Sequence, residues 1–439
     1  MDDKLSHKLR RLGVAKGARN LKPAPKPTLN WDLDSGKRPF PPPSTTSFEE
    51  GFDPPQPIDT LLPGIRREET AEGACYILDK VYPLNYQHGQ DLLQALLTLS
   101  PAPAAVFTQD TRLESLNFRD FLFIDTETTG LAGAGTLAFM VGAAFFERGT
   151  AGDVFVVRQY FLRDHGDEPA MLLLLDELVA EKAGLITFNG RSFDIPLLDT
   201  RFLMNRMRSD IRQKPHIDLL PPARRLWRQR LGSCALGSLE ETLLGLHRTH
   251  EDVPGFLIPS LYNAYLRHGD ATALSRVFYH NQIDMVSMVT LASRVMRQFA
   301  HAAADDHPID LYSLGKWQAS LGDWTTSEQT LKQAVQGDLP LDTYHQALAE
   351  LAALLKRQDR RAEAIPYWQQ IAATSFDDIS AHLELAMHYE WQEQDLAAAI
   401  TWTERALALS QSWPPSRAAL VQAELAHRLT RLQRKLTPS

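Results

Sequence analysis

The apolar positions between residues 118 and 162 fall into three dense runs separated by short polar stretches. The runs read FLFID, TLAFMVGAAFF and VFVVRQYFL, and they are rich in Val, Phe, Leu and Ala. Apolar runs of this kind predict β-strands, and links as short as these favour antiparallel neighbours. The chain is therefore expected to build a sheet in this region.

After these strands the apolar spacing changes to that of a helix. Residues 168–183, EPAMLLLLDELVAEKA, predict a helix, LITF predicts another short strand, and Asn189-Gly190 predicts a turn. Several helical segments follow. Three strands, a helix, a strand and then helices indicate an α/β layer with a mixed sheet.

The regions around this layer carry further signals. Ser238 and Glu241 have the form of a capping box, which predicts a helix with leucines on one side at positions 239, 243 and 246. Residues 67–115 mix helix and strand signals, including CYILDKVYPL and DLLQALLTL, and predict a lead-in packed on the layer. We therefore expect one domain over residues 67–302.

Beyond residue 308 the strand pattern disappears and Ala/Leu-rich helical segments recur. Turn sequences beginning at Gly322, Gln358 and Gln394 are spaced by 36 residues, and each follows one predicted helix and precedes another. This period resembles that of the tetratricopeptide repeat family. A plain helical bundle is the alternative, and both interpretations predict an all-α domain over residues 308–436.

The first 66 residues have the composition of a tail. Eleven of the 27 prolines lie before residue 64, and residues 1–40 hold ten Lys or Arg against four acids. Such a segment cannot form a packed core, so we expect residues 1–66 to be disordered, as a basic arm or an unstructured leader.

The chain shows no signal for a membrane or a secretory pathway. The N-terminus has no apolar core of a secretory signal, and no run of about 18 apolar residues predicts a membrane helix. The two cysteines, Cys75 and Cys234, are far apart and lack a CxxC spacing. This usage suits a reducing compartment, so we expect a cytoplasmic protein without a membrane partner.

The strand FLFID runs directly into two acids, in the sequence FIDTETTG. Asp125 and Glu127 are two residues apart, so in a strand they point to the same face. Adjacent carboxylates repel each other unless a cation lies between them, and hard oxygen ligands suit Mg²⁺ or Mn²⁺. An isolated Asp-x-Glu is common in loops, and the flanking Thr-Thr-Gly makes this one more specific.

Two further segments place acids on predicted helices. In FNGRSFD a strand ends in a turn and Asp194 begins a helix, where it is either a helix cap or a functional acid. In YHNQID, which starts a helix, His280 and Asp284 are one turn apart on the same face. They form either a surface pair or a proton acceptor beside a metal-binding carboxylate.

Together these three segments resemble the motifs of the DEDD exonuclease superfamily, which has a ribonuclease H-like fold. Longer stretches, among them HIDLLPPARRLW and SCALGSLEETLLGL, resemble its YprB-type branch, over roughly residues 68–300. The resemblance implies a ribonuclease H-like mixed sheet with flanking helices. It also implies two Mg²⁺ or Mn²⁺ ions held by Asp125, Glu127, Asp194 and Asp284, with Asp125 bridging both ions.

The third motif departs from the superfamily pattern, which has a Tyr four residues before the Asp or a His five residues before it. Here His280 is at minus four and Tyr279 at minus five. We assign His280 as the proton acceptor because it shares the face of Asp284, and we expect Tyr279 in the core. By their place in the motifs, Thr128, Asn189 and Arg191 are assigned to substrate binding, with a turn-forming role as the alternative for Asn189.

Positive charge gathers between residues 201 and 230, although the net charge of the chain is −8. This run holds nine Lys or Arg against Asp210 and Asp218. With Trp227 it can track a nucleic-acid strand by phosphate contact and stacking, or it can be a set of solvated helix faces around a core Trp. Asp218 is either a helix cap or a further acid near the site.

These inferences lead to one expected function and one alternative. We expect a metal-dependent nuclease, a DEDD-type 3′→5′ exonuclease that hydrolyses DNA or RNA from a single-stranded 3′ end by a two-metal mechanism, with repeats that bind an unknown protein partner. The alternative is a catalytically weak or inactive nucleic-acid-binding scaffold that recruits partners through its repeats.

Overall fold

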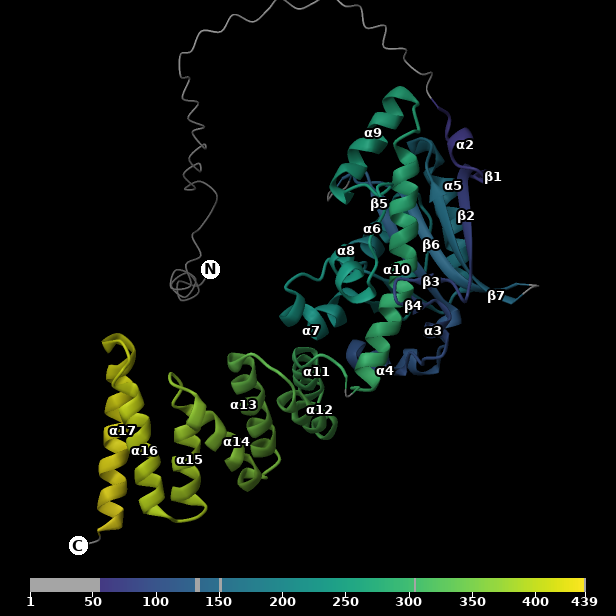
Figure 1. Cartoon of the computed structure of the whole chain (residues 1–439). Helices are drawn as coiled ribbons and strands as arrows, with labels where there is room; N and C mark the ends of the chain where they lie inside the picture. The colour runs from purple at the N-terminus through teal and green to yellow at the C-terminus, as the bar shows by residue number, and fades with distance from the viewer. Residues whose placement is uncertain (1–55, 131–134, 150–151, 304, 438–439) are drawn as a thin grey trace, which may run out of the picture. The chain divides into compact units, whose positions relative to one another are not determined.

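The structure is a computed structural model that describes residues 56–130, 135–149, 152–303 and 305–437. A strand-rich part is followed by a part made only of helices (Figure 1). Most of the expected tail, residues 1–55, lies outside the described residues. The rest contains packed structure, because α2 spans Ile58–Leu61 and Ile58 is buried. Ordered structure thus begins before the expected boundary at residue 66.

The centre of the first part is a seven-stranded sheet in the order β1-β2-β7-β6-β5-β8-β9. β5, β6 and β7 pair antiparallel, as expected, while β8 and β9 run parallel to β5. The sheet is therefore mixed. Its strands are β1 (Arg66–Thr70), β2 (Gly73–Pro83), β5 (Phe121–Thr128), β6 (Ala138–Gly149), β7 (Gly152–Phe161), β8 (Gly184–Thr187) and β9 (His216–Asp218); β3 (Gln87–His88) and β4 (Asp91–Leu92) form a separate pair.

Helices cover both faces of this sheet, and strand alternation decides which residue meets which helix. In β5, Leu122 and Ile124 enter one apolar core, whereas Phe121 and Phe123 enter the other. The first core is closed by α5 (Glu168–Glu181), α6 (Asp194–Met204) and α9 (Ile258–His268); the second is closed by most of α10 (Leu274–Ala300), with α3 (Gln94–Leu97), α4 (Ala102–Thr108) and α7 (Leu220–Leu231). Figure 1 shows α10 lying along the sheet.

Three details differ from the sequence-based expectation. The segment around residues 67–83 is not a separate lead-in, because β2 pairs with β7 along most of its length and extends the sheet. β9 was not expected; it is only three residues long and gives too short an apolar run to stand out. The helix that carries the third motif starts at Leu274, so Tyr279 lies inside α10 rather than at its start.

The expected capping box at Ser238 is wrong. The helix α8 (Leu236–Leu239) begins before Ser238, and the chain continues as a π-helical turn over Glu240–Leu244. The hydroxyl of Ser238 contacts that of Ser233 instead of a helix N-terminus. The wider π turn changes the spacing of buried positions, so Leu244 is buried together with the carboxylate of Glu240. π turns of this kind occur often at functional sites.

The second part of the chain is the expected all-helical region. Its helices are α11 (Pro308–Ser320), α12 (Trp324–Gln336), α13 (Leu341–Arg357), α14 (Arg361–Thr374), α15 (Ser380–Trp391), α16 (Leu396–Ser410) and α17 (Pro415–Leu436). The three turn sequences each adopt a left-handed backbone, with φ of 88° at Gly322, 59° at Asp359 and 55° at Gln394. The resemblance to tetratricopeptide repeats stays a prediction. In the described ranges, no helix combines the length and apolar character needed to cross a bilayer.

Candidate active site

The carboxyl end of β5 presents the first two acids. The alternation that directs Phe121 and Phe123 toward α10 also directs Asp125 and Glu127 to that face. The parallel neighbour β8 pairs with β5 only as far as Phe123, so the strand edge beyond it is open. A bulge after Glu127 then interrupts the pairing with β6. The two carboxylates therefore stand where the sheet opens.

Asp194 reaches this strand end from α6. Thr126 points to the opposite face of β5 from its neighbours, and its hydroxyl donates a hydrogen bond to Asp194 Oδ1 at 2.5 Å. Asp194 is the first residue of α6 and is buried, whereas Phe193 occupies the N-cap position. Asp194 is thus held against β5 and is not the cap of its helix.

The helix α10 contributes the remaining motif residues. His280 Nε2 lies 3.4 Å from Asp284 Oδ2, in line with their helical spacing. Asn281 donates from Nδ2 to Asp125 Oδ2 at 2.9 Å, and its Oδ1 accepts from Gln159 at 3.0 Å. Asn281 is fully buried and therefore links α10 to both β5 and β7.

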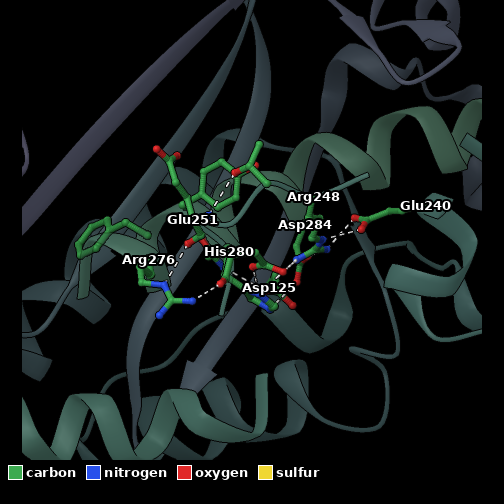
Figure 2. A network of polar contacts seen from close by, with 12 residues as sticks. Asp125, Glu240, Arg248, Glu251, Arg276, His280 and Asp284 are labelled. Carbon is green, nitrogen blue, oxygen red and sulfur yellow. Dashed lines mark hydrogen bonds and ion pairs between the residues drawn. The ribbon is translucent and has the colours of Figure 1, made fainter. Parts of the chain in front are cut away.

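Arg248 brings a positive charge into this group of acids (Figure 2). It lies in the loop after the π-helical turn, and its guanidinium donates to both carboxylate oxygens of Glu240, at 2.6 and 2.7 Å. It also donates to Asp284 Oδ1. The side chain of Glu240 is 1% exposed and those of Arg248 and Asp284 are each 14% exposed. The bidentate pair with Glu240 anchors Arg248 against Asp284.

The loop that carries Arg248 is tied to α10 at a second point. Arg276 donates to the backbone carbonyls of Glu251 and Asp252 (Figure 2). Asp252 Oδ1 in turn lies 2.8 Å from His280 Nδ1. Arg248 Nη1 lies 3.2 Å from the same nitrogen, so the Asp252 carboxylate is the closer of its two partners. Because a carboxylate accepts hydrogen bonds, this closer contact favours a proton on Nδ1 and leaves Nε2 as the nitrogen that faces Asp284.

Burial raises the pKa values of the four motif acids, and the charges of other motif acids add to this for Asp125 and Glu127. Burial, followed by the charges of Asp194, Asp284 and Glu127, holds the pKa of Asp125 well above its usual range. Burial, with the charges of Asp284 and Asp194, raises the pKa of Glu127 to about 8. Burial raises the pKa of Asp194 to about 6 and also raises that of Asp284. Acids that are distant in sequence thus form one electrostatic cluster.

The same carboxylates act on His280. Burial by itself lowers the pKa of this imidazole, but the charges of Asp284 and Glu127 and the hydrogen bond to Asp252 outweigh burial and raise it. The protonated ring is therefore favoured while the acids carry uncompensated charge. His280 can accept a proton only when that negative charge is offset.

The donor set of the cluster fits a hard divalent cation. In the described part of the chain, no three His, Cys, Asp or Glu side chains converge closely enough to make a ready-formed metal site, and Arg248 already compensates Asp284. The four carboxylates nevertheless supply the oxygen donors that Mg²⁺ and Mn²⁺ prefer. Burial, and for Asp125 and Glu127 also the charge of neighbouring acids, raises their pKa values, and a bound cation would offset both effects. Asp125, Glu127, Asp194 and Asp284 are the residues that could hold it.

The three residues assigned to substrate binding lie in the turns around the acids. Thr128 is half-buried, and its hydroxyl donates to the carbonyl of Gly130 at 2.7 Å. Asn189 has a left-handed backbone, with φ of 68°, and its backbone N–H donates to Asp218 Oδ1. Arg191 is exposed, donates to the carbonyl of His216, and lines a cavity beside α6 instead of pointing into the acid cluster. Their substrate role stays a prediction.

Three alternatives from the sequence are decided by local contacts. Asp218 accepts hydrogen bonds from the backbone amides of Leu220, the first residue of α7, and of Asn189, so it holds both turns, although Leu219 and not Asp218 is the N-cap of α7. Its charge also contributes to the raised pKa of Asp194, so it lies near the site as well. Trp227 is 2% exposed and donates to Gln298, which makes it a core residue and not a stacking platform. The expectation that Tyr279 lies in the core is wrong, because this ring is half-buried and its hydroxyl accepts from Thr249.

Two exposed aromatic residues adjoin residues of the site in the chain. Phe193 directly precedes Asp194 and is 56% exposed, and Phe256 is 80% exposed. Phe256 follows Gly255, where an added Cβ would lie 3.9 Å from His280 Nε2. Large apolar side chains this exposed beside a polar cluster provide flat faces on which a base can stack.

Comparison with known proteins agrees with this arrangement. Residues 122–296 match the model of the RNase_H_2 family, described as RNase_H superfamily. This segment carries an RNase H-superfamily domain. All four motif acids, His280 and Arg248 fall within it. The chain is also 29% identical to the uncharacterized protein YprB of Bacillus subtilis (strain 168) over 336 residues, covering 74% of this chain and 78% of the Bacillus protein.

Several residues of the site escaped the sequence-based analysis. Asn281 lies three residues before Asp284, so helical spacing alone could have placed it on the same face. Glu240 was assigned to a helix start that does not exist. Arg248 and Asp252 belong to a loop without periodicity, and no local signal distinguishes them from other charged loop residues. Their role follows only from packing against α10.

Proposed function

We propose that this protein is a metal-dependent nuclease that hydrolyses phosphodiester bonds of DNA or RNA as a DEDD-type 3′→5′ exonuclease. The observation that supports it best is the meeting of Asp125, Glu127, Asp194 and Asp284 in one cluster, with His280 one helical turn from the last of them. The RNase H-superfamily match supports a nucleic-acid substrate.

In this proposal the four carboxylates hold Mg²⁺ or Mn²⁺ ions, and Asn281 orients Asp125 by its hydrogen bond. When bound, two such ions position the phosphate, lower the pKa of the attacking water and stabilise the leaving oxygen. Thr126 orients Asp194 in the same manner as Asn281 orients Asp125. These hydrogen bonds come from the buried framework of the sheet and α10, which holds the metal-binding carboxylates in place before a metal binds.

His280 takes the proton of the attacking water through Nε2. Asp252 holds Nδ1 at 2.8 Å, which fixes the ring and its tautomer. Compensation of the charges on Asp284 and Glu127 lowers the pKa of the imidazole toward its ordinary range, so that the neutral form is available as a base. Arg248, held by Glu240, remains beside the site as a cation able to contact a phosphate oxygen.

The exposed rings of Phe193 and Phe256 support a single-stranded substrate. Bases of an unpaired strand can stack on aromatic side chains, whereas the bases of a duplex are stacked on each other. Phe193 directly precedes Asp194, and Phe256 follows Gly255, whose backbone lies beside His280. The two rings can therefore position the terminal nucleotides across the acids.

The test is hydrolysis of 5′-labelled single-stranded DNA and RNA with Mn²⁺ or Mg²⁺, compared with EDTA. Asp284→Asn protein, prepared identically, controls for contaminating nucleases. A metal-dependent ladder that shortens from the 3′ end and is absent in the variant is expected. Internal cuts would replace the exonuclease with an endonuclease, and equal activity of the variant would refute the proposed site.

The scaffold alternative rests on Arg248, which already compensates Asp284, and on the lack of a ready-formed metal site among the described residues. If the acids serve only to hold Arg248 and the loop in place, the protein binds nucleic acid without cleaving it. Retained binding of the same oligonucleotides, without products in either metal, would favour this function.

We also propose that the helices after α12 bind a protein partner, as their resemblance to tetratricopeptide repeats implies. The left-handed turns at Asp359 and Gln394 close antiparallel helix pairs of the kind that stack into extended surfaces. Crosslinking of the full-length protein in cells, followed by mass spectrometry, should join α13–α17 to one other protein. Crosslinks confined to the chain itself would count against a partner.

A further inference from the structure

A cavity of about 570 Å³ lies where α7 meets α11. Its lining residues carry four positive charges and no Asp or Glu; they are Arg224, Arg225, Arg228, Gln229, Ser313, Lys316, Trp317 and Ser320. We call this cavity the basic groove. A concave surface with charges of one sign attracts a polyanion and raises its local concentration.

The arginines of the basic groove lack the acidic partners that neighbouring basic residues have. Four others of the run between residues 201 and 230 form ion pairs: Arg201 with Glu168, Arg212 with Asp199, Lys214 with Asp210 and Arg230 with Asp310. Among the described residues, Arg224, Arg225 and Arg228 form no ion pair. Arg224 and Arg228 are four residues apart on α7, a spacing at which like charges destabilise a helix by a few tenths of a kcal/mol. Their clustering therefore carries a small cost for the folded protein, which a bound anion would remove.

Fixed contacts shape the groove before any ligand arrives. Arg230 donates from Nε to both carboxylate oxygens of the buried Asp310, at 2.9 Å each, and so joins α7 to α11. The ring of Trp317 lies 5.2 Å from that of Phe107 and 4.7 Å from that of Phe299, measured between centroids. α11 is therefore packed on the apolar core that lies between the sheet and α10.

The groove offers charge but no open aromatic face. Trp317 is only 4% exposed, and the guanidinium of Arg225 lies over its ring at 5.7 Å from the centroid. A base cannot stack on a ring that is already covered. The groove is thus suited to phosphates, and its contacts carry no information about sequence.

α7 connects the groove to the acid cluster. Asp218, which accepts from the amide of the first residue of this helix, also holds the turn that leads to Asp194. At 1.5 Å per residue, Arg224 and Arg228 lie about 6 and 12 Å along the helix from its first residue, Leu220. A strand that ends at the acids can therefore continue along α7.

A second basic cavity beside α6 is a weaker candidate. Its lining includes Arg112, Arg191, Arg212 and Lys214, but Arg112 is paired with Asp110 and two of the others have the acidic partners named above. The positive charge of this cavity is largely compensated by acids, so an anion should bind there less favourably than in the basic groove.

We propose that the basic groove binds the phosphate backbone of a single-stranded nucleic acid, 5′ to the end that is hydrolysed. This inference rests on the proposed function for the direction of the strand, but not for the binding itself. It gives α11, the first helix of the helical region, a role in holding nucleic acid in addition to any protein partner. Binding along the groove should not depend on base sequence.

The test measures binding in EDTA, so that it does not require hydrolysis. Fluorescence anisotropy of labelled 20-mer oligonucleotides, one of dT and one of mixed sequence, is recorded over a range of salt concentrations for the full chain. For single strands each phosphate contact contributes about 0.7 to the slope of log affinity against log salt. Arg224→Gln/Arg228→Gln should reduce the magnitude of the slope by about 1.4 for both sequences and weaken binding.

The control variant, Arg357→Gln/Arg434→Gln, removes the same charge from two exposed arginines of α13 and α17 that form no ion pair in the described residues. It should leave the slope unchanged, and melting temperatures should show that both variants fold. Equal slopes for the wild type and the groove variant, or no binding of either oligonucleotide by the wild type, would overturn the proposal.

Two further measurements separate phosphate binding in the groove from hydrolysis at the acids and from binding of an acidic protein. If the wild type binds the oligonucleotides without ever hydrolysing them, and the groove variant loses this binding, the proposed nuclease is refuted and the proposed groove is supported. If the wild type hydrolyses them and the groove variant binds them as the wild type does, the proposed groove is refuted and the proposed nuclease is supported. Labelled poly-glutamate should bind at least tenfold more weakly than the oligonucleotides, and tighter binding of this polymer would assign the groove to an acidic protein instead.

Discussion

Replacing Arg248 with methionine should destabilise the protein strongly in the absence of divalent metal. Methionine keeps most of the apolar stem but removes the charge between Glu240 and Asp284. These carboxylates are 1% and 14% exposed, so water cannot compensate them. Breaking a buried ion pair from one side costs about 3–5 kcal/mol, since the partner remains as an unpaired buried charge.

The expected change is large enough for a thermal melt. For a domain of this size, 1 kcal/mol lowers the melting temperature by about 2 °C, so Arg248→Met should melt about 6–10 °C below the wild type in EDTA. The double variant Glu240→Gln/Arg248→Met should lose less stability than Arg248→Met. It also neutralises Glu240, the more deeply buried of the two carboxylates that Arg248→Met leaves without a partner.

Added Mn²⁺ tests whether Arg248 substitutes for a cation. A metal ion that binds the folded acids stabilises them, and it should raise the melting temperature of Arg248→Met more than that of the wild type, because the variant lacks the guanidinium charge at Asp284 and keeps only His280 there. Arg276→Met is the matched control, since within the described part of the chain Arg276 donates hydrogen bonds only to backbone carbonyls of the same loop. A variant as stable as the wild type in EDTA, or an Mn²⁺ shift no larger than that of the control, would refute this reasoning.

Asp125→Asn should abolish metal-dependent hydrolysis and leave the metal-free protein at least as stable as the wild type, because one member of a repelling cluster becomes neutral; activity and urea unfolding in EDTA check both parts. The free energy of unfolding of the metal-free protein should fall as pH rises from 4.5, the ordinary pKa of Glu127, to about 8, because the folded state keeps a proton that the unfolded state has lost. Urea titrations at several pH values measure this dependence, and Glu127→Gln should make it flatter. Phe256→Ala should raise KM for single-stranded oligonucleotides with little change in kcat, which steady-state kinetics measure; a loss confined to kcat would contradict a stacking role. Gly142→Ala should cost about 1–3 kcal/mol of stability, since the new Cβ would overlap Oδ1 of Asn281; an unchanged urea midpoint would show that Asn281 can move aside.

Local patterns were reliable where a short segment determines its own geometry. The alternation along FIDTE put Asp125 and Glu127 on one face of β5, and helical spacing put His280 beside Asp284. Both follow from fixed backbone periods and need no knowledge of the rest of the chain. The same reasoning failed at Ser238, because a π turn has a different period from the helix that the capping pattern assumes.

The sequence by itself determined the mixed α/β layer, the all-helical region after it, and which residues could supply acids at the end of a strand and on a helix. Only the tertiary structure decided that β1 and β2 join the main sheet, that Trp227 is buried, and that Arg248 lies between Glu240 and Asp284. The physical reason is the range of the interactions. Strand and helix periods act between residues a few positions apart, whereas the contact of Arg248 with Asp284 spans 36 residues and exists only because the loop is packed on α10.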